Sequence, residues 1–344
     1  MTLRWIRKRE GLCFPILLVL LIALGITLIF CTVVGSVNIP LQEIVKILFR
    51  TGESSGNYEA ILLKIRLPRV LNAALVGAAL SISGTSMQGL LKNPLADGST
   101  LGVSSGASLG AVLAIALGLR IPGTPYAATT VMAVAFAAAS LFFILMLSHR
   151  LDYSLSTHTI LLMGIIFGMF VNSIISMVLV VAEDHLRSIV FWTMGSLNGS
   201  NFGDTKLLAV TFVVFGSFIL SRAKELNAFA LGESIASNLG VDVQREKMWL
   251  LIASSSLIGV TVAVSGTIGF VGLVIPHMSR LAFGSNHKTL LPISAFIGAI
   301  FLLLTDLMAR TLFRPQELPI GVITSFFGSL VFVYLFAEKR RSRC

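Results

Sequence analysis

Charged residues are scarce in this sequence. Asp, Glu, Lys and Arg make up 12% of its 344 residues, whereas 55% are hydrophobic, and the mean hydropathy is +0.90. A chain of this composition cannot form the polar surface of a soluble protein, so we expect a polytopic membrane protein. Its net charge of +10 is then explained by cations at the membrane edges, and we expect no nucleic-acid partner.

Cysteine and nucleotide-binding motifs are also sparse. The three cysteines, Cys13, Cys31 and Cys344, do not have the spacing of a disulfide framework or of a metal site. The sequence contains no GxxxxGK[ST] loop for nucleotide phosphates. We therefore expect this chain to have no catalytic residues and to bind no metal or other cofactor.

Long apolar runs dominate what remains. Runs of suitable length for crossing a bilayer fall at about 12–34, 67–91, 101–119, 126–148, 159–182, 207–221, 249–264, 268–283, 291–309 and 318–337. They predict an all-α fold with ten transmembrane helices in a single domain, 1–344. The run at 101–119 is rich in glycine and serine, so we expect it in the interior. A short amphipathic or re-entrant helix is expected between 187 and 204.

Basic residues at both ends of the chain predict its orientation. Arginine and lysine occur within 4–9 and again within 339–343. Because cytoplasmic segments are enriched in these residues, we expect both the N-terminus (1–11) and the C-terminal tail (338–344) in the cytoplasm. The same alternation places the segment 223–247 in the cytoplasm.

One internal repeat has a constant offset. Gly77, Ser83, Gly84, Thr85 and Pro94 recur 182 positions later as Gly259, Ser265, Gly266, Thr267 and Pro276. The two copies begin an odd number of predicted crossings apart, so the halves would have opposite topology. Inverted repeats of this kind are typical of transporters.

The energy source is less evident from the residues. Asp306 is the one acidic residue placed well inside an apolar run, one turn before Arg310. A structural ion pair is the more economical interpretation, but an ion-coupled secondary carrier using Asp306 stays an alternative, as does a channel-like pore. If ATP drives transport, another subunit must bind the ATP, and that subunit would dock on the segment 223–247.

Six signatures carry a family resemblance over about 65–336. They are RLPR at 66–69, SGTSMQGLLKNPLAD at 83–97, LGVSSGA at 101–107, ALGESIASNLG at 230–240, GTIGFVGLVIPHMSR at 266–280 and ELPIGVIT at 317–324. The chain resembles the FecCD-type permeases of ABC importers for iron-siderophores, haem and cobalamin. Gly98 stands where the family usually has proline, and Ser329-Leu330 replaces its usual pair of a small residue and proline. The resemblance therefore does not predict the local helix geometry at these two positions.

The resemblance implies a type II ABC importer permease in a bacterial cytoplasmic membrane. It implies a dimer with an identical or related permease chain, two ATPase subunits that bind ATP and magnesium, and an external substrate-binding protein. The permease itself would not be an enzyme. A ferric siderophore is the favoured cargo, with haem and cobalamin as open alternatives.

The resemblance also assigns roles to particular residues. ATPase coupling falls on a pair of short helices with Leu231, Gly232, Glu233, Ala236, Leu239 and Gly240. Arg66, Arg69 and Arg310 would present cations to acidic residues of the binding protein, although membrane anchoring, or bracing of a helix start by Arg66, is the simpler alternative. The segment Ser156, Thr157 and His158 resembles the cytoplasmic gate of the pathway.

Two further assignments remain open. Met163 and Phe167, with Met169 and Met177, would line the pathway or would instead serve helix packing. His277 has no second ligand at i+3 or i+4, so we expect a hydrogen bond at a helix end rather than metal binding.

Overall fold

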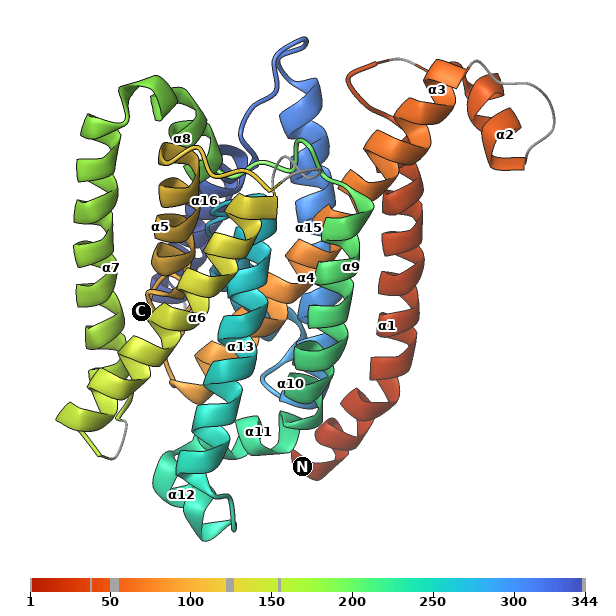
Figure 1. Cartoon of the computed structure of the whole chain (residues 1–344). Coiled ribbons are helices and arrows are strands. Elements are labelled where there is room, and N and C mark those ends of the chain that lie inside the picture. Colours follow the sequence, from red (N-terminus) through yellow and green to blue (C-terminus); the bar gives the residue numbers. More distant parts are fainter. Residues whose placement is uncertain (1, 38, 50–55, 122–126, 154–155, 342–344) are drawn as a thin grey trace.

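A bundle of helices forms the protein, and all regular elements of the described residues are helical. The computed structural model describes residues 2–37, 39–49, 56–121, 127–153 and 156–341. The predicted all-α class is therefore confirmed. Helices α11 (Ala223–Leu231) and α12 (Glu233–Asn238) lie at the same end of the bundle as the start of α1 (Thr2–Val33) (Figure 1). We refer to this as the α12 end.

The bundle combines long and short apolar helices. Among the described residues, seven helices are long and apolar enough to span a membrane, and three further apolar helices, near the expected runs 101–119, 268–283 and 318–337, are shorter. The remaining elements, in chain order, are α2 (Leu41–Phe49), α3 (Gly56–Ala60), α4 (Leu67–Leu90), α5 (Val103–Ala116), α6 (Ala127–Leu151), α7 (Thr157–Val181), α8 (Leu186–Thr193), α9 (Phe202–Thr211), α10 (Ser217–Ser221), α13 (Val243–Ser265), α14 (Val271–Phe283), α15 (His287–Thr311) and α16 (Ile320–Arg341).

Two of the spans are assembled from several of these elements. A π-helical segment, Ile61–Arg66, joins α3 to α4, so that this span is longer than the predicted 67–91. A second π-helical segment, Phe212–Gly216, joins α9 to α10. Such segments commonly occur inside α-helices at irregular or functional positions. The short helix expected between 187 and 204 is α8.

Helix α4 occupies the centre of the bundle. It packs against α13, α14 and α15, and most of its side chains are buried. Close approach is possible because small residues meet at the crossings: Gly77 faces Gly298 of α15, and Gly84 faces Gly272 of α14. Without a hydrophobic driving force between helices in lipid, such close contacts supply the packing energy. The predicted interior position of the glycine- and serine-rich span is also confirmed, since α5 is largely buried against α6 and α7.

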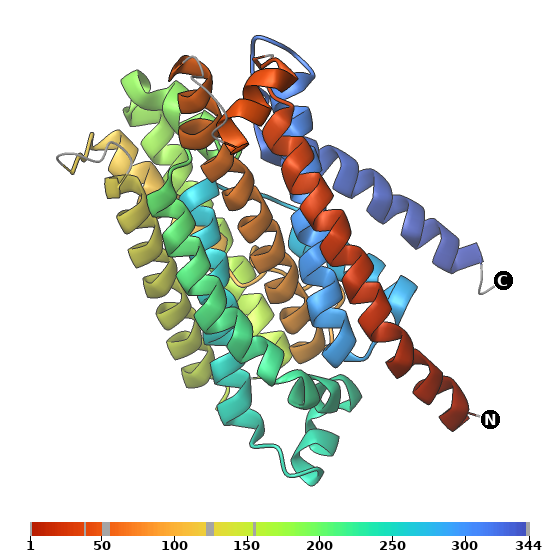
Figure 2. The same ribbon diagram turned by 90° about the vertical axis from the view of Figure 1, so that its right-hand side faces the viewer.

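The repeated motif lies on two helices that run in opposite directions. Helix α4 runs toward the α12 end, whereas α13 runs away from it (Figures 1 and 2). Gly77 and Gly259 both lie in the middle of their helices. The correspondence stops further along, because Gly84 is still inside α4 whereas Gly266 ends α13 with a positive φ of 67°.

The contact between α4 and α14 can be tested with one methyl-bearing side chain. A Cβ atom at Gly84 would overlap the carbonyl group of Gly272, whereas at Gly25 nothing lies within 4 Å. We expect Gly84→Val to destabilise the protein by about 3 kcal/mol or more, because neither backbone can retreat. Thermal unfolding of the purified protein measures this, with Gly25→Val as the matched control. Equal midpoints for the two variants would contradict the packing.

Candidate functional site: the α11–α12 pair and the adjoining cavity

Two glycines fix the shape of the pair α11–α12 at the α12 end of the bundle. Gly232 joins the helices with a φ of 136°, and Gly240 follows α12 with a φ of 86°. Residues with a Cβ atom rarely adopt these conformations. Phe229 and Ala236 are fully buried and hold the pair against the bundle. The two short helices therefore have the geometry predicted for 223–247.

Apolar side chains project outward from this pair. Leu231 is 62% exposed, Ile235 46% and Leu239 65%. Ile235 and Leu239 are four residues apart on α12 and share one face, whereas Leu231 ends α11, before the turn at Gly232. Exposed apolar side chains beside polar residues are typical of a protein contact. The sequence prediction named Leu231 and Leu239 but missed Ile235, which lies one helical turn before Leu239 on α12.

A buried ion pair connects α12 to the long helix that follows it. The Nζ atom of Lys247 in α13 lies 2.8 Å from Oε1 of Glu233, and the Lys247 side chain is fully buried. A buried ammonium group is stable only with such a partner. The pair therefore links α12 to α13.

A cavity of about 500 Å³ brings the predicted gate and coupling residues together. Its lining combines Leu91, Lys92 and Asn93 after α4 with Ser156, Thr157, His158 and Leu161 at the start of α7, and with Glu233 of α12. Segments far apart in sequence thus meet in one space. The predicted gate residues lie beside the predicted coupling residue Glu233, a neighbourhood that the sequence did not reveal.

Hydrogen bonds fix the start of α7 at this cavity. The Ser156 side chain caps the helix by accepting from the Thr159 backbone N–H at 3.4 Å. Asp152 accepts from the Ser156 N–H and from the Thr159 hydroxyl, each at 3.2 Å. Ser156 therefore positions the helix start, while His158 is exposed. These bonds hold the backbone at Ser156, and the next two residues, Thr157 and His158, line the cavity.

Beyond its start, α7 exposes a strip of neutral side chains. Met169 is 68% exposed and Met177 71%, and the polar residues Asn172, Ser173 and Ser176 are exposed between them. Asn172 also lines a second cavity of about 190 Å³, together with the α5 hydroxyls of Ser104, Ser105 and Ser108. Exposed polar groups in the middle of a spanning helix are typical of a face turned toward water or a partner subunit.

Met163 and Phe167 do not belong to this strip. Both are half-buried, and the Phe167 ring lies 5.7 Å from that of Phe143 in α6. Their positions agree with the helix-packing alternative, because they face the bundle rather than the exposed side of α7.

The three arginines expected to dock a binding protein are buried, which corrects their expected exposure. Arg66 is 4% exposed, Arg69 7% and Arg310 3%. Arg66 donates to the carbonyl groups of Thr32, Val33 and Val37 and so caps the end of α1. Helix ends leave carbonyl groups without partners, and a cation there is favourable. Arg66 thus caps a helix end, a role that requires no external partner.

Arg69 and Arg310 belong to a four-residue ion cluster. Arg69 Nε lies 2.9 Å from Asp306 Oδ1, and its Nη1 lies 2.9 Å from Glu317 Oε2. Arg310 Nε lies 3.1 Å from Asp306 Oδ2, and its Nη2 donates to the Cys31 carbonyl at 2.9 Å. Two positive and two negative groups balance. The expected pairing of Asp306 with Arg310 is confirmed. The second partner of Asp306, Arg69, and the pairing of Arg69 with Glu317 were not recognised.

His277 lies in α14, with its ring 6.4 Å from that of Phe332. Among the residues that the structure describes, no group of three or more His, Cys, Asp or Glu side chains has a geometry suited to a metal ion.

Comparison with known proteins gives consistent matches over almost the whole chain. The model of the FecCD transport family matches residues 19–338. The chain is 45% identical to the ABC transporter permease protein YvrB of Bacillus subtilis over 92% of both chains. It is 36% identical to the hemin transport system permease protein HmuU of Yersinia pestis over 98% of both. It is 38% identical to the vitamin B12 import system permease protein BtuC of Vibrio vulnificus, over 81% of this chain and 83% of that one.

A solved structure has the same fold. It is described as an inward-facing conformation of a metal-chelate type ABC transporter, and it superimposes with a TM-score of 0.84 at 32% identity. The match covers 94% of this chain and 99% of the other.

The ion cluster provides a stability prediction. Replacing Asp306 with alanine leaves two buried guanidinium groups facing each other without their shared carboxylate. We expect a loss of about 3–5 kcal/mol in unfolding free energy, seen as a lower thermal midpoint of the purified protein. Asp184→Ala, at an exposed position, is the control. If Asp306→Ala were as stable as this control, the cluster would not hold the helices together.

Proposed function

Because the chain belongs to the FecCD transport family and is an ABC importer permease for metal chelates, we propose that its cargo is a ferric siderophore. ATP hydrolysis in such importers is performed by separate ATPase subunits, so this chain is a transport subunit and not an enzyme. ATP and magnesium would be bound by those subunits. Haem and vitamin B12, named for two of the relatives, are the alternative cargoes.

The exposed strip of α7 supports a chelated cargo. Thioether, amide and hydroxyl groups at Met169, Asn172 and Ser173 are neutral and form weak contacts with an organic ligand shell. A wall of this kind lets a large chelate pass without holding the metal. In a dimer, the strip would face its counterpart across the pathway, and selectivity would come chiefly from the external binding protein.

The coupling step would begin at α11–α12. We place the ATPase contact on the exposed apolar side chains of Leu231, Ile235 and Leu239, at the cytoplasmic face of the membrane. Movement of α12 would reach α13 through the pair Glu233–Lys247. It would also alter the cavity that Glu233 shares with Thr157 and His158, which would open or close the pathway. The single observation that carries this proposal is that one cavity is lined both by the segment 156–158 and by Glu233.

Docking of the external protein would use other cations than those first expected. Lys64, Arg120, Arg187 and Arg314 are exposed, unlike the buried Arg66, Arg69 and Arg310. Exposed charges of this kind set the encounter rate and register of a complex more than its affinity.

Uptake by reconstituted vesicles tests the function. The chain would be reconstituted with its ATPase and binding protein, and entry of a radiolabelled ferric siderophore would be measured. We expect uptake only with ATP on the ATPase side, because Asp306 is already paired with two arginines and is not available to carry ions. Uptake driven by a proton or sodium gradient without the ATPase would instead support a secondary carrier. ATP-dependent uptake of haem or vitamin B12, but not of the siderophore, would correct the cargo alone.

A substitution at Gly232 tests the coupling helices. Valine there would be strained by roughly 1–3 kcal/mol, because φ is far outside its usual range. We expect Gly232→Val to insert normally but to lose roughly tenfold or more of its ATP-dependent uptake. Ser237→Val places the same side chain at an exposed helical position of α12 and serves as the control. Equal uptake by both variants would remove the coupling role from this turn.

A further inference from the structure

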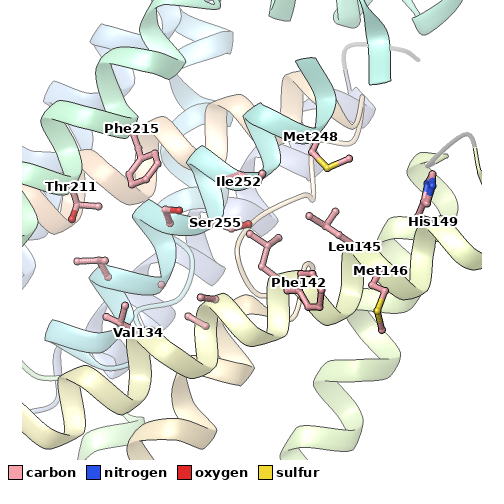
Figure 3. A pocket seen from close by; sticks show the side chains of 16 residues that line it. Val134, Phe142, Leu145, Met146, His149, Thr211, Phe215, Met248, Ile252 and Ser255 are labelled. Carbon is pink, nitrogen blue, oxygen red and sulfur yellow. The ribbon is translucent and has the colours of Figure 1, made fainter. Parts of the chain in front are cut away.

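A groove runs along the outside of the bundle between α6, α13 and the span α9–α10. Its volume is about 630 Å³, and apolar side chains such as Val134, Phe142, Leu145, Phe215 and Ile252 line it (Figure 3). It lies apart from the cavity at the gate, and no step of transport described above uses it. Its lining is too apolar for a water-soluble ligand.

The length of the groove matches that of a hydrocarbon chain. Its lining on α6 extends from Val134 to His149, and a helix rises about 22 Å over that interval. This is most of the roughly 30 Å thickness of a bilayer core. The groove therefore has room for an extended chain that lies parallel to the helices.

The surface around the groove is apolar as well. Phe142 is 69% exposed, Val210 63% and Val213 65%. Side chains of this size and exposure on spanning helices face hydrocarbon. The groove thus opens toward lipid, and an acyl chain of the bilayer is the apolar molecule available to fill it.

The end of the groove nearest to α12 carries positive charge. His149 and Met248 mark this end (Figure 3). Arg150 follows His149 at the end of α6, and Arg245 lies one helical turn before Met248 on α13, so the backbones of both arginines are level with this end of the groove. Both arginines are exposed. Trp249 is 50% exposed here, as expected of a residue at the membrane–water interface.

Acidic residues near this mouth are already engaged. Glu246 lies 3.4 Å from Arg222 in an ion pair, Asp242 caps α13 by accepting from the Arg245 backbone N–H, and Asp152 accepts from the start of α7. Glu246 is therefore paired with a cation other than Arg150 and Arg245, whose exposed guanidinium groups can attract an anion.

We propose that the groove binds one acyl chain of an anionic phospholipid, whose phosphate group is held by Arg150 and Arg245. The apolar wall selects the hydrocarbon, and the paired guanidinium groups select the negative headgroup. The lipid would fill the space between α6 and α13 beside the helix that carries coupling movements. This inference depends on the membrane position of the chain and not on the identity of its cargo.

Native mass spectrometry of the intact permease tests the proposal. The detergent-solubilised protein would be equilibrated with an equimolar mixture of phosphatidylglycerol and phosphatidylcholine. The detergent would then be removed in the mass spectrometer, and the lipids that stay bound would be identified. We expect one tightly held lipid per chain, with phosphatidylglycerol preferred at least fivefold. Equal retention of the two lipids, or no retained lipid, would overturn the proposal.

Two sets of variants separate the acyl site from the headgroup site. Ala138→Phe fills the groove and should abolish retention, whereas Ala139→Phe, at the exposed position beside it, should not. If Ala138→Phe fails to fold, Ser256→Leu fills the groove from α13. Arg150→Gln with Arg245→Gln should remove the preference for phosphatidylglycerol, whereas Lys288→Gln, at an exposed cation in the first turn of α15, should retain it. Retention by a folded groove-filling variant, or unchanged preference in the double arginine variant, would contradict the assignment.

Discussion

The buried ion cluster of Arg69, Asp306, Arg310 and Glu317 is the constraint on which the arrangement of the helices depends. A charge inside a membrane protein is costly unless it has a partner, and here each guanidinium group meets a carboxylate within 3.1 Å. The cluster joins α4 to α15 and to the segment that precedes α16. Through the Cys31 carbonyl it also holds α1. Any large separation of these helices would leave a buried charge exposed to hydrocarbon.

The opposite end of the bundle is built differently. There, α11 and α12 meet at a glycine turn, contact the bundle through a few buried side chains, and border a cavity rather than a packed core. Local movements require regions with fewer packed contacts. The ion cluster thus holds α1, α4 and α15 together at one end of the bundle. The proposed ATPase contact and the proposed gate lie at the other end, beside the cavity. Rigid frames that move around a fixed pathway are typical of transporters.

Local sequence patterns predicted the features that depend on local physics. Apolar length identified the spans, and glycine content placed α5 in the interior. The paired short helices were implied by the family resemblance, and Gly232 and Gly240 do form the turns there. Long-range partners were not predictable in this way. Arg69 and Asp306 are 237 positions apart, and nothing in the residues around Arg69 indicates that it is buried. For the same reason the cations were first interpreted as a docking surface, and the neighbourhood of Glu233 with the segment 156–158 became visible only in the folded chain.

The central claim is that movement of α12 reaches the gate through the cavity between Glu233, the loop after α4 and the start of α7. A cross-link across this cavity tests it most directly. Cysteines would replace Asn93, which lines the cavity, and Ser234, the exposed neighbour of Glu233 in α12, so that the pair Glu233–Lys247 stays intact. A short reducible reagent would join the two cysteines in the assembled transporter. The account predicts that uptake stops on cross-linking while the ATPase stays bound, and that it returns after reduction. Each single-cysteine variant should remain active after the same treatment. Full uptake by the cross-linked double variant would contradict the account, because the cavity would then not need to change during transport.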